Sequence, residues 1–128
     1  MKKFLLVLAF SSAIGPAVFS QTHKNKCNIE IKGASPHVVM DKLLWYSVDF
    51  YNGSQKAVDA LEWDAYFYDK FDEVIAVRKG SWSCGDWVKC LQSGETRTDR
   101  EMPKGIGDAD HVRIEVKRVH FVGGTSCD

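Results

Sequence analysis

The sequence has no excess of either charge, because 17 Lys and Arg residues balance 17 Asp and Glu residues in a chain of 128. A protein that binds nucleic acid needs a basic patch that releases counterions from phosphates, and none is present. Nucleic acid is therefore not an expected partner. After residue 20 the chain also lacks any long apolar run. We expect no membrane insertion of this part, since a spanning helix needs about 20 apolar residues.

Signatures of catalysis are also missing. The four histidines are scattered without an H-E-x-x-H spacing, and no G-x-S-x-G or phosphate-binding glycine loop occurs. Asp69 and Asp72 could bind calcium, but Asp is favoured in turns for its own backbone hydrogen bonds. We predict a protein that is not an enzyme and uses no metal or cofactor. The alternative, a small secreted hydrolase or metal-binding protein, would require His111 or His120 beside a carboxylate in a polar pocket.

The first twenty residues have the pattern of a secretory signal peptide. Lys2 and Lys3 precede an apolar run over residues 4–10, and a Gly-Pro breaker with small residues leads to Ser20. We expect cleavage near Ser20 and a secreted or periplasmic mature chain, residues 21–128. The alternative is that this run forms a first core strand. The mature length suits one domain with a single hydrophobic core.

All four cysteines lie after residue 20, at Cys27, Cys84, Cys90 and Cys127. An even number in an oxidising compartment indicates disulfides, and four cysteines allow three pairings. Cys84 and Cys90 flank a short loop that contains glycine, whereas chain ends often lie near each other. We therefore favour pairing 84 with 90 and 27 with 127. A zinc site is the alternative, but a lone C-x5-C lacks the close spacing of zinc ligands.

Apolar residues alternate with polar ones along most of the chain, and no long stretch has helical periodicity. The first strong run places four residues on one face: Leu44, Tyr46, Val48 and Phe50. It stops at Asn52-Gly53, which favours a two-residue hairpin turn. The next strand should place Trp63 in the core, with Tyr66 and Tyr68 on the opposite face.

The last long run changes parity between Val116 and Val119, which a β-bulge near Lys117 and Arg118 would explain. A polar strand over residues 96–100 belongs at a sheet edge. With a strand near residues 27–32 and a short one at the end, the chain has about seven antiparallel strands separated by turns. This all-β pattern predicts an immunoglobulin-like β-sandwich.

Several motifs lie from residue 52 onward. They are Asn52-Gly53-Ser54, Ala65-Tyr66-Phe67-Tyr68-Asp69, Leu91 to Glu95, and Val119-His120-Phe121 with Gly124-Thr125. Together they resemble the N-x-S, F-x-L-Y-D, L-x-P-G-E and V-x-F-x-D-G-T motifs of small bacterial secreted immunoglobulin-like domains of the FxLYD type. The chain departs from that pattern at Ala65, Phe67, Ser93 and Gly123. The resemblance implies the fold and an extracytoplasmic setting. It transfers no catalytic residue, because such domains are generally accessory or binding modules.

Two surfaces are candidate binding sites. In the segment from Gly80 to Cys90, Trp82 and Trp87 bracket Cys84, and a disulfide would preorganise both rings for contact. The alternative is that one or both rings fold back onto the sandwich or the bridge.

The second surface carries Tyr66 and Tyr68, joined by Trp45 and Tyr51 if their strands are neighbours. It could bind a partner or pack inside the sandwich. We expect an exported binding or accessory module that contacts a protein or glycan partner. A structural, self-assembling module is the alternative, and a symmetric interface through Tyr66 and Tyr68 would favour it.

Overall fold

The computed structural model describes residues 27–128, so the predicted signal peptide lies outside the described residues. This part contains seven strands and no helix. The strands are β1 (Ile29–Val39), β2 (Lys42–Asn52), β3 (Val58–Tyr68), β4 (Val74–Ser83), β5 (Thr96–Glu101), β6 (His111–Phe121) and β7 (Ser126–Cys127). Among these residues there is accordingly no helix with the length and hydropathy to cross a membrane. The predicted all-β class and strand number are confirmed.

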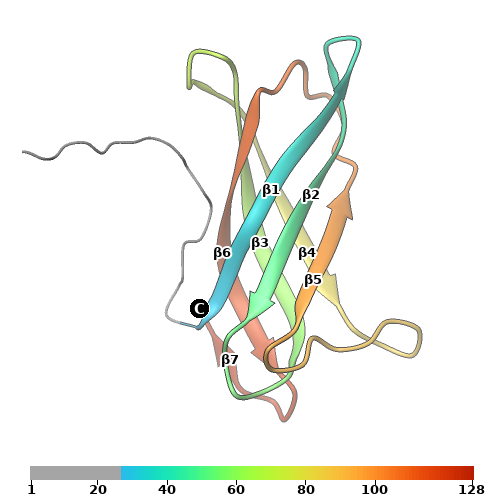
Figure 1. Ribbon diagram of the computed structural model, residues 1–128, viewed down its shortest axis with the longest axis vertical. Coiled ribbons are helices and arrows are strands. Elements are labelled where there is room, and N and C mark those ends of the chain that lie inside the picture. The colour runs from blue at the N-terminus through green and yellow to red at the C-terminus, as the bar shows by residue number, and fades with distance from the viewer. Residues whose placement is uncertain (1–26) are drawn as a thin grey trace, which may run out of the picture.

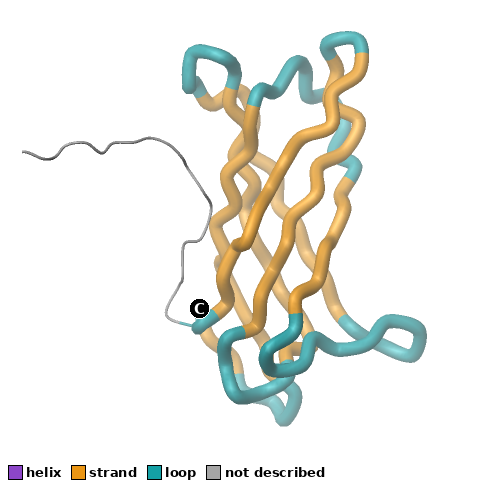
Figure 2. Tube along the Cα trace, viewed as in Figure 1, coloured by secondary structure: helices purple, strands orange, loops and turns teal. Residues whose placement is uncertain are grey.

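The strands form two antiparallel sheets that pack face to face (Figure 1). One sheet has the order β1-β2-β5 and the other has the order β4-β3-β6-β7. The chain passes from one sheet to the other after β2, after β4 and after β5, so its loops gather at the two ends of the sandwich (Figure 2). This arrangement confirms the predicted immunoglobulin-like sandwich.

The prediction of a hairpin at Asn52-Gly53 is wrong, because β2 and β3 belong to different sheets. Residues 53–57 instead cross the end of the sandwich, and Asn52 is buried beneath them. Its side-chain amide donates hydrogen bonds to the carbonyl oxygens of Lys56 and Leu91 at 2.8 and 3.0 Å. The two-residue hairpin lies between β1 and β2, where Met40 and Asp41 both have positive φ, as a type I′ turn requires.

Trp63 is a core residue, as its alternation in β3 predicted. Its indole N–H donates a hydrogen bond of 3.0 Å to the hydroxyl of Tyr46 in the opposite sheet. The ring also packs against Phe50, with ring centroids 4.8 Å apart. On the neighbouring strand, a Cβ placed on Gly80 would lie 2.3 Å from the Trp63 ring. Only glycine therefore lets β4 approach the ring so closely.

Within residues 27–128, register shifts interrupt the strand pairings at five places, and two of these irregularities bear on the predicted positions. In β2, Leu43 is buried and Leu44 is 44% exposed, so the predicted inward position of Leu44 is wrong. The reason is a register shift against β1: His37 pairs with Trp45 but Val38 pairs with Leu43, which leaves Leu44 as an extra residue. In β6, Lys117 is the extra residue opposite Glu62 and Trp63, which confirms the predicted bulge.

Both predicted disulfides are present. Cys27 pairs with Cys127, and the two residues are 100 positions apart in the chain. Cys84 pairs with Cys90 and closes a loop with a separation of 6. The first bridge joins the segment that enters β1 to β7, and so it links the two sheets covalently at the end where the chain enters the fold.

The close approach of Gly80 to Trp63 gives a stability prediction. Gly80→Ala should lower the free energy of unfolding by about 1–3 kcal/mol, because the added methyl group overpacks the core. Gly85→Ala is the matched control, since a Cβ there meets no atom within 4 Å. Urea unfolding of both variants measures the difference. Equal stability of the two variants would contradict the proposed steric constraint.

The disulfides should differ in their contributions to stability. In the loop-entropy model, a bridge that closes 100 residues contributes about 4.7 kcal/mol, whereas one that closes 6 residues contributes about 2 kcal/mol. The double variant Cys27→Ala/Cys127→Ala should therefore lose more stability than Cys84→Ala/Cys90→Ala. Thermal unfolding under non-reducing conditions tests the order, and the reverse order would show that chain entropy is not the main contribution.

Candidate functional site

The structure separates the two candidate tryptophans. Trp82 belongs to β4 and is only 7% exposed, whereas Trp87 lies in the following loop and is 96% exposed. The ring of Trp82 packs with the core, and the guanidinium of Arg97 lies 4.6 Å from its centroid. The alternative in which a ring folds back is therefore correct for Trp82. Trp87 remains as the exposed candidate.

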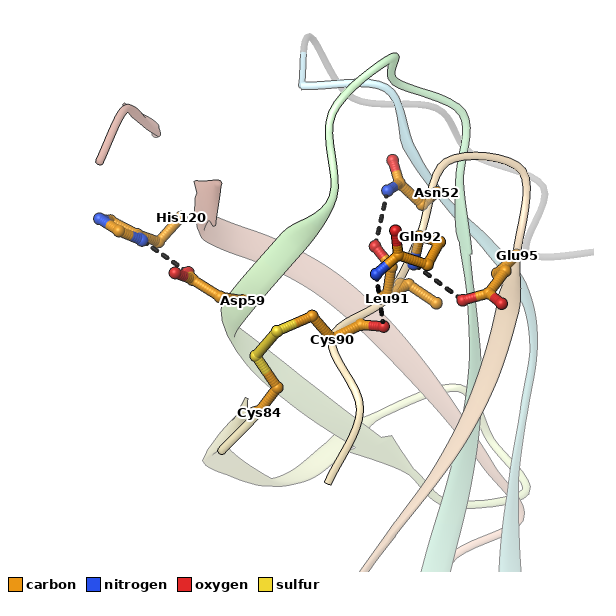
Figure 3. Close-up of a disulfide and its surroundings, with 8 residues drawn as sticks. All are labelled: Asn52, Asp59, Cys84, Cys90, Leu91, Gln92, Glu95 and His120. Carbon is orange, nitrogen blue, oxygen red and sulfur yellow. Dashed lines mark hydrogen bonds and ion pairs between the residues drawn. A yellow bond between two sulfur atoms is a disulfide. The ribbon is translucent and has the colours of Figure 1, made fainter. Parts of the chain in front are cut away.

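The loop that carries Trp87, residues 84–90, is fixed at its base. The Cys84–Cys90 bridge closes it, and Gly85 and Val88 exchange backbone hydrogen bonds of 2.9 and 3.4 Å. The backbone N–H of Cys84 also donates to the carbonyl of Asp59 at 2.9 Å. Figure 3 shows the bridge beside the start of β3, which carries Asp59. We call residues 84–90 the Trp87 loop.

Beyond the Trp87 loop, the chain is anchored to the first residue of β3. Val58 and Leu91 exchange two backbone hydrogen bonds of 2.8 and 2.9 Å. The Asn52 side-chain amide also donates to the Leu91 carbonyl, as Figure 3 shows. In the next turn, the Gln92 N–H donates to the Glu95 carboxylate at 2.8 Å. The loop therefore projects from a rigid support.

A depression of about 340 Å³ lies between the returning arm of the Trp87 loop and the start of β5. Lys89 and Arg97 both line it. Sequence reasoning missed these two residues, because they are eight positions apart in the chain and only the crossing from β4 to β5 brings them together. No local pattern in the sequence indicates the depression.

Tyr66 and Tyr68 lie half-buried on the outer face of the four-stranded sheet, and both side chains contact residues of β6. The Tyr66 hydroxyl donates to Glu115 at 3.0 Å, and this hydrogen bond raises the tyrosine's pKa. Arg113 donates to the Tyr68 hydroxyl at 3.1 Å and lies over the Tyr66 ring. His111 stacks on Tyr68 with ring centroids 4.7 Å apart.

Trp45 and Tyr51 do not join this tyrosine face. Both belong to β2, which lies in the three-stranded sheet. The prediction of a continuous aromatic surface is therefore wrong. The error follows from the hairpin assumed at Asn52, since a hairpin would have placed β2 beside β3. Trp45 instead stacks on His37, with ring centroids 3.9 Å apart.

The histidines near carboxylates form cross-strand and turn contacts. The Nδ1 atom of His120 lies 2.6 Å from Asp59, and His111 lies 3.2 Å from both Asp72 and Asp110. Among residues 27–128, no hydroxyl or thiol is hydrogen-bonded to either imidazole. Neither histidine lines the depression beside the Trp87 loop. Within the same range, no three His, Cys, Asp or Glu side chains are grouped to hold a metal ion.

β5 directs three charged side chains toward the interior, at the open side of the sandwich. They are Arg97, Asp99 and Glu101, which pair with the inward positions of β2. Arg97 and Asp99 lie 3.5 Å apart. Partial burial of Glu101, followed by its hydrogen bond to Asp99 and the charge of Asp99, raises the pKa of Glu101 to about 7. Charges directed inward at a sheet edge also discourage the addition of another strand.

The raised pKa of Glu101 predicts that stability depends on pH. The protonated carboxyl favours the folded state, so its contribution is complete below the ordinary value of 4.5 and is lost as the pH rises through about 7. The free energy of unfolding should therefore fall from about pH 5 to pH 8, and Glu101→Gln should reduce this fall. Glu73→Gln, at an exposed carboxylate, is the control. Identical pH profiles for wild type and Glu101→Gln would contradict the prediction.

Comparison with known proteins assigns no family, since no family model, curated protein or solved structure matches the chain.

Proposed function

We propose that the protein is an exported, non-catalytic binding module that contacts a protein or glycan partner through the Trp87 loop. The observation that carries this proposal is the exposure of Trp87. Its side chain is 96% exposed in the middle of a loop closed by a disulfide. A Trp side chain buries 150–250 Å² in a contact, which corresponds to about 4–6 kcal/mol of transfer free energy. A partner that covers the ring gains the part of this free energy that exceeds the cost of association.

The rigidity of the loop supports the proposal. Association normally costs free energy because flexible loops and side chains must be ordered at the interface. Here the Cys84–Cys90 bridge and the Gly85–Val88 hydrogen bonds order the loop when the domain folds. Lys89, which is two residues beyond Trp87 in the same loop, is exposed and lines the depression, so its ammonium group offers hydrogen-bond donors to the same partner.

The Trp87 loop is a better candidate than the tyrosine face. Tyr66 and Tyr68 already have partners on β6, so a ligand would compete with existing contacts. Trp87, in contrast, has no hydrogen bond or ring contact within residues 27–128. An exposed aromatic ring at a loop end is also typical of binding hot spots, where Trp is enriched.

Export is supported by the two disulfides and by the signal-peptide pattern. Structural disulfides persist mainly in oxidising compartments, such as the periplasm and the extracellular space. All four cysteines are paired. The motif resemblance to FxLYD-type domains, which are generally accessory or binding modules, agrees with this proposal.

Single substitutions distinguish the two tryptophans. Trp87→Ala should change the free energy of unfolding by less than about 0.5 kcal/mol, because the side chain is exposed. It should nevertheless abolish partner binding. Trp82→Ala should cost about 3–5 kcal/mol of stability, because it leaves a cavity. Urea unfolding measures both stabilities.

Binding can be measured with the purified protein immobilised and exposed to extracellular and cell-surface material of the source organism. Met40→Ala is the matched control, because Met40 is 89% exposed at the opposite end of the sandwich. Retention should be lost with Trp87→Ala and kept with Met40→Ala. If Trp87→Ala retained the same components as wild type, the Trp87 loop would not be the contact surface.

A further inference from the structure

A second concave surface lies at the same end of the sandwich as the Trp87 loop. It is a depression of about 470 Å³ between the β2–β3 crossover, the residue that precedes β1, and the β6–β7 turn. These segments meet at the lower end of the molecule in Figures 1 and 2. We call this depression the crossover pocket. None of its residues belongs to the Trp87 loop.

Exposed polar side chains that have no hydrogen-bond partner in the described part of the protein surround the crossover pocket. They are Asn28, Gln55, Lys56, Thr125 and Ser126. The side chains of these five residues make no hydrogen bond or ion pair within residues 27–128. Amides and hydroxyls each donate and accept hydrogen bonds, so this set matches a ligand that carries several hydroxyl groups. The buried ring of Phe121 adds an apolar contact to the same lining.

The charge of the pocket further restricts the ligand. Lys56 is the one charged residue in the lining, and no Asp or Glu side chain lines the pocket. An ammonium group donates hydrogen bonds but accepts none, and its bonds to carboxylates are stronger than its bonds to neutral oxygens. The pocket therefore favours a ligand with a negative group over its neutral counterpart.

The walls of the pocket are rigid before any ligand binds. The Gly53 N–H donates to the carbonyl of Asn28 at 2.8 Å, and the Val122 N–H donates to the carbonyl of Ala57 at 2.9 Å. A Cβ on Gly53 would lie 3.0 Å from the Asn28 carbonyl oxygen, so the two walls touch closely. The adjacent Cys27–Cys127 bridge holds Asn28 beside Ser126. A preorganised pocket avoids much of the ordering cost of binding.

We infer that the crossover pocket binds an acidic saccharide unit, a sugar ring that carries a carboxylate. The sugar hydroxyls bond to the amides and hydroxyls of Asn28, Gln55 and Thr125, and the carboxylate pairs with Lys56. This inference goes beyond the role proposed for the Trp87 loop and does not depend on it.

The test is a titration of the purified, oxidised protein, followed by the chemical shifts of its backbone amides in NMR spectra. The probes are methyl glucuronoside and methyl glucoside, which differ only in a carboxylate against a hydroxymethyl group. The glucuronoside should shift the amides of residues 53–56 and 124–127. The glucoside should bind about ten-fold more weakly, because it lacks the charged hydrogen-bond acceptor.

Lys56→Gln should make the affinities for the two probes equal. Because the Lys56 side chain makes no hydrogen bond or ion pair within residues 27–128, the substitution removes no contact that supports the fold. Lys42→Gln, an exposed lysine at the opposite end of the sandwich, should leave both affinities unchanged. The substitution pair therefore separates a specific contact from the loss of one positive charge.

Three outcomes would overturn the inference. Equal affinity of the wild-type protein for both probes would contradict the proposed pairing of the ligand carboxylate with Lys56. Acetate shifting the same amides as strongly as the glucuronoside would show a site for carboxylate ions alone. Shifts absent from the pocket, or confined to residues 84–90, would exclude the pocket as the saccharide site, and the latter result would still support the proposed role of the Trp87 loop.

Discussion

Trp63 lies between the two sheets, and the sandwich is arranged around its ring. Its indole N–H reaches across to Tyr46 in the three-stranded sheet, while β4 comes close enough that residue 80 has to be glycine. A buried tryptophan on the third strand of an immunoglobulin-like sandwich commonly has this position. Because the ring lies against β4 at Gly80, it helps to position the last residues of that strand, from which the Trp87 loop leaves the fold.

The local periodicity of the sequence predicts much of this architecture. Alternation in β3 places Trp63 in the core, and the parity change in β6 predicts the bulge at Lys117. The separation of Trp82 from Trp87 could also have been predicted. If the alternation is continued through β4 to Ser83, Trp82 shares the inward face with Gly80.

Other features have no local signal. Asn52-Gly53 is typical of a hairpin, yet the chain crosses between sheets there, because Asn52 bonds to a carbonyl 39 residues later in the chain. That one difference separates β2 from β3 and divides the expected aromatic surface between two sheets. The crossover pocket is likewise built from segments distant in sequence. The depression beside the Trp87 loop is lined by one stretch, residues 89–98, but no local pattern shows how that stretch folds back on itself.

The Cys27–Cys127 bridge gives the domain a mechanical property. In most sandwiches, a pulling force on the two chain ends acts on the hydrogen bonds of the terminal strands and unravels them. Here the bridge connects the start of the fold directly to its last strand across 100 residues. Tension applied to the chain on either side of the bridge therefore passes through one covalent bond, and the sheets between the two cysteines carry almost no load.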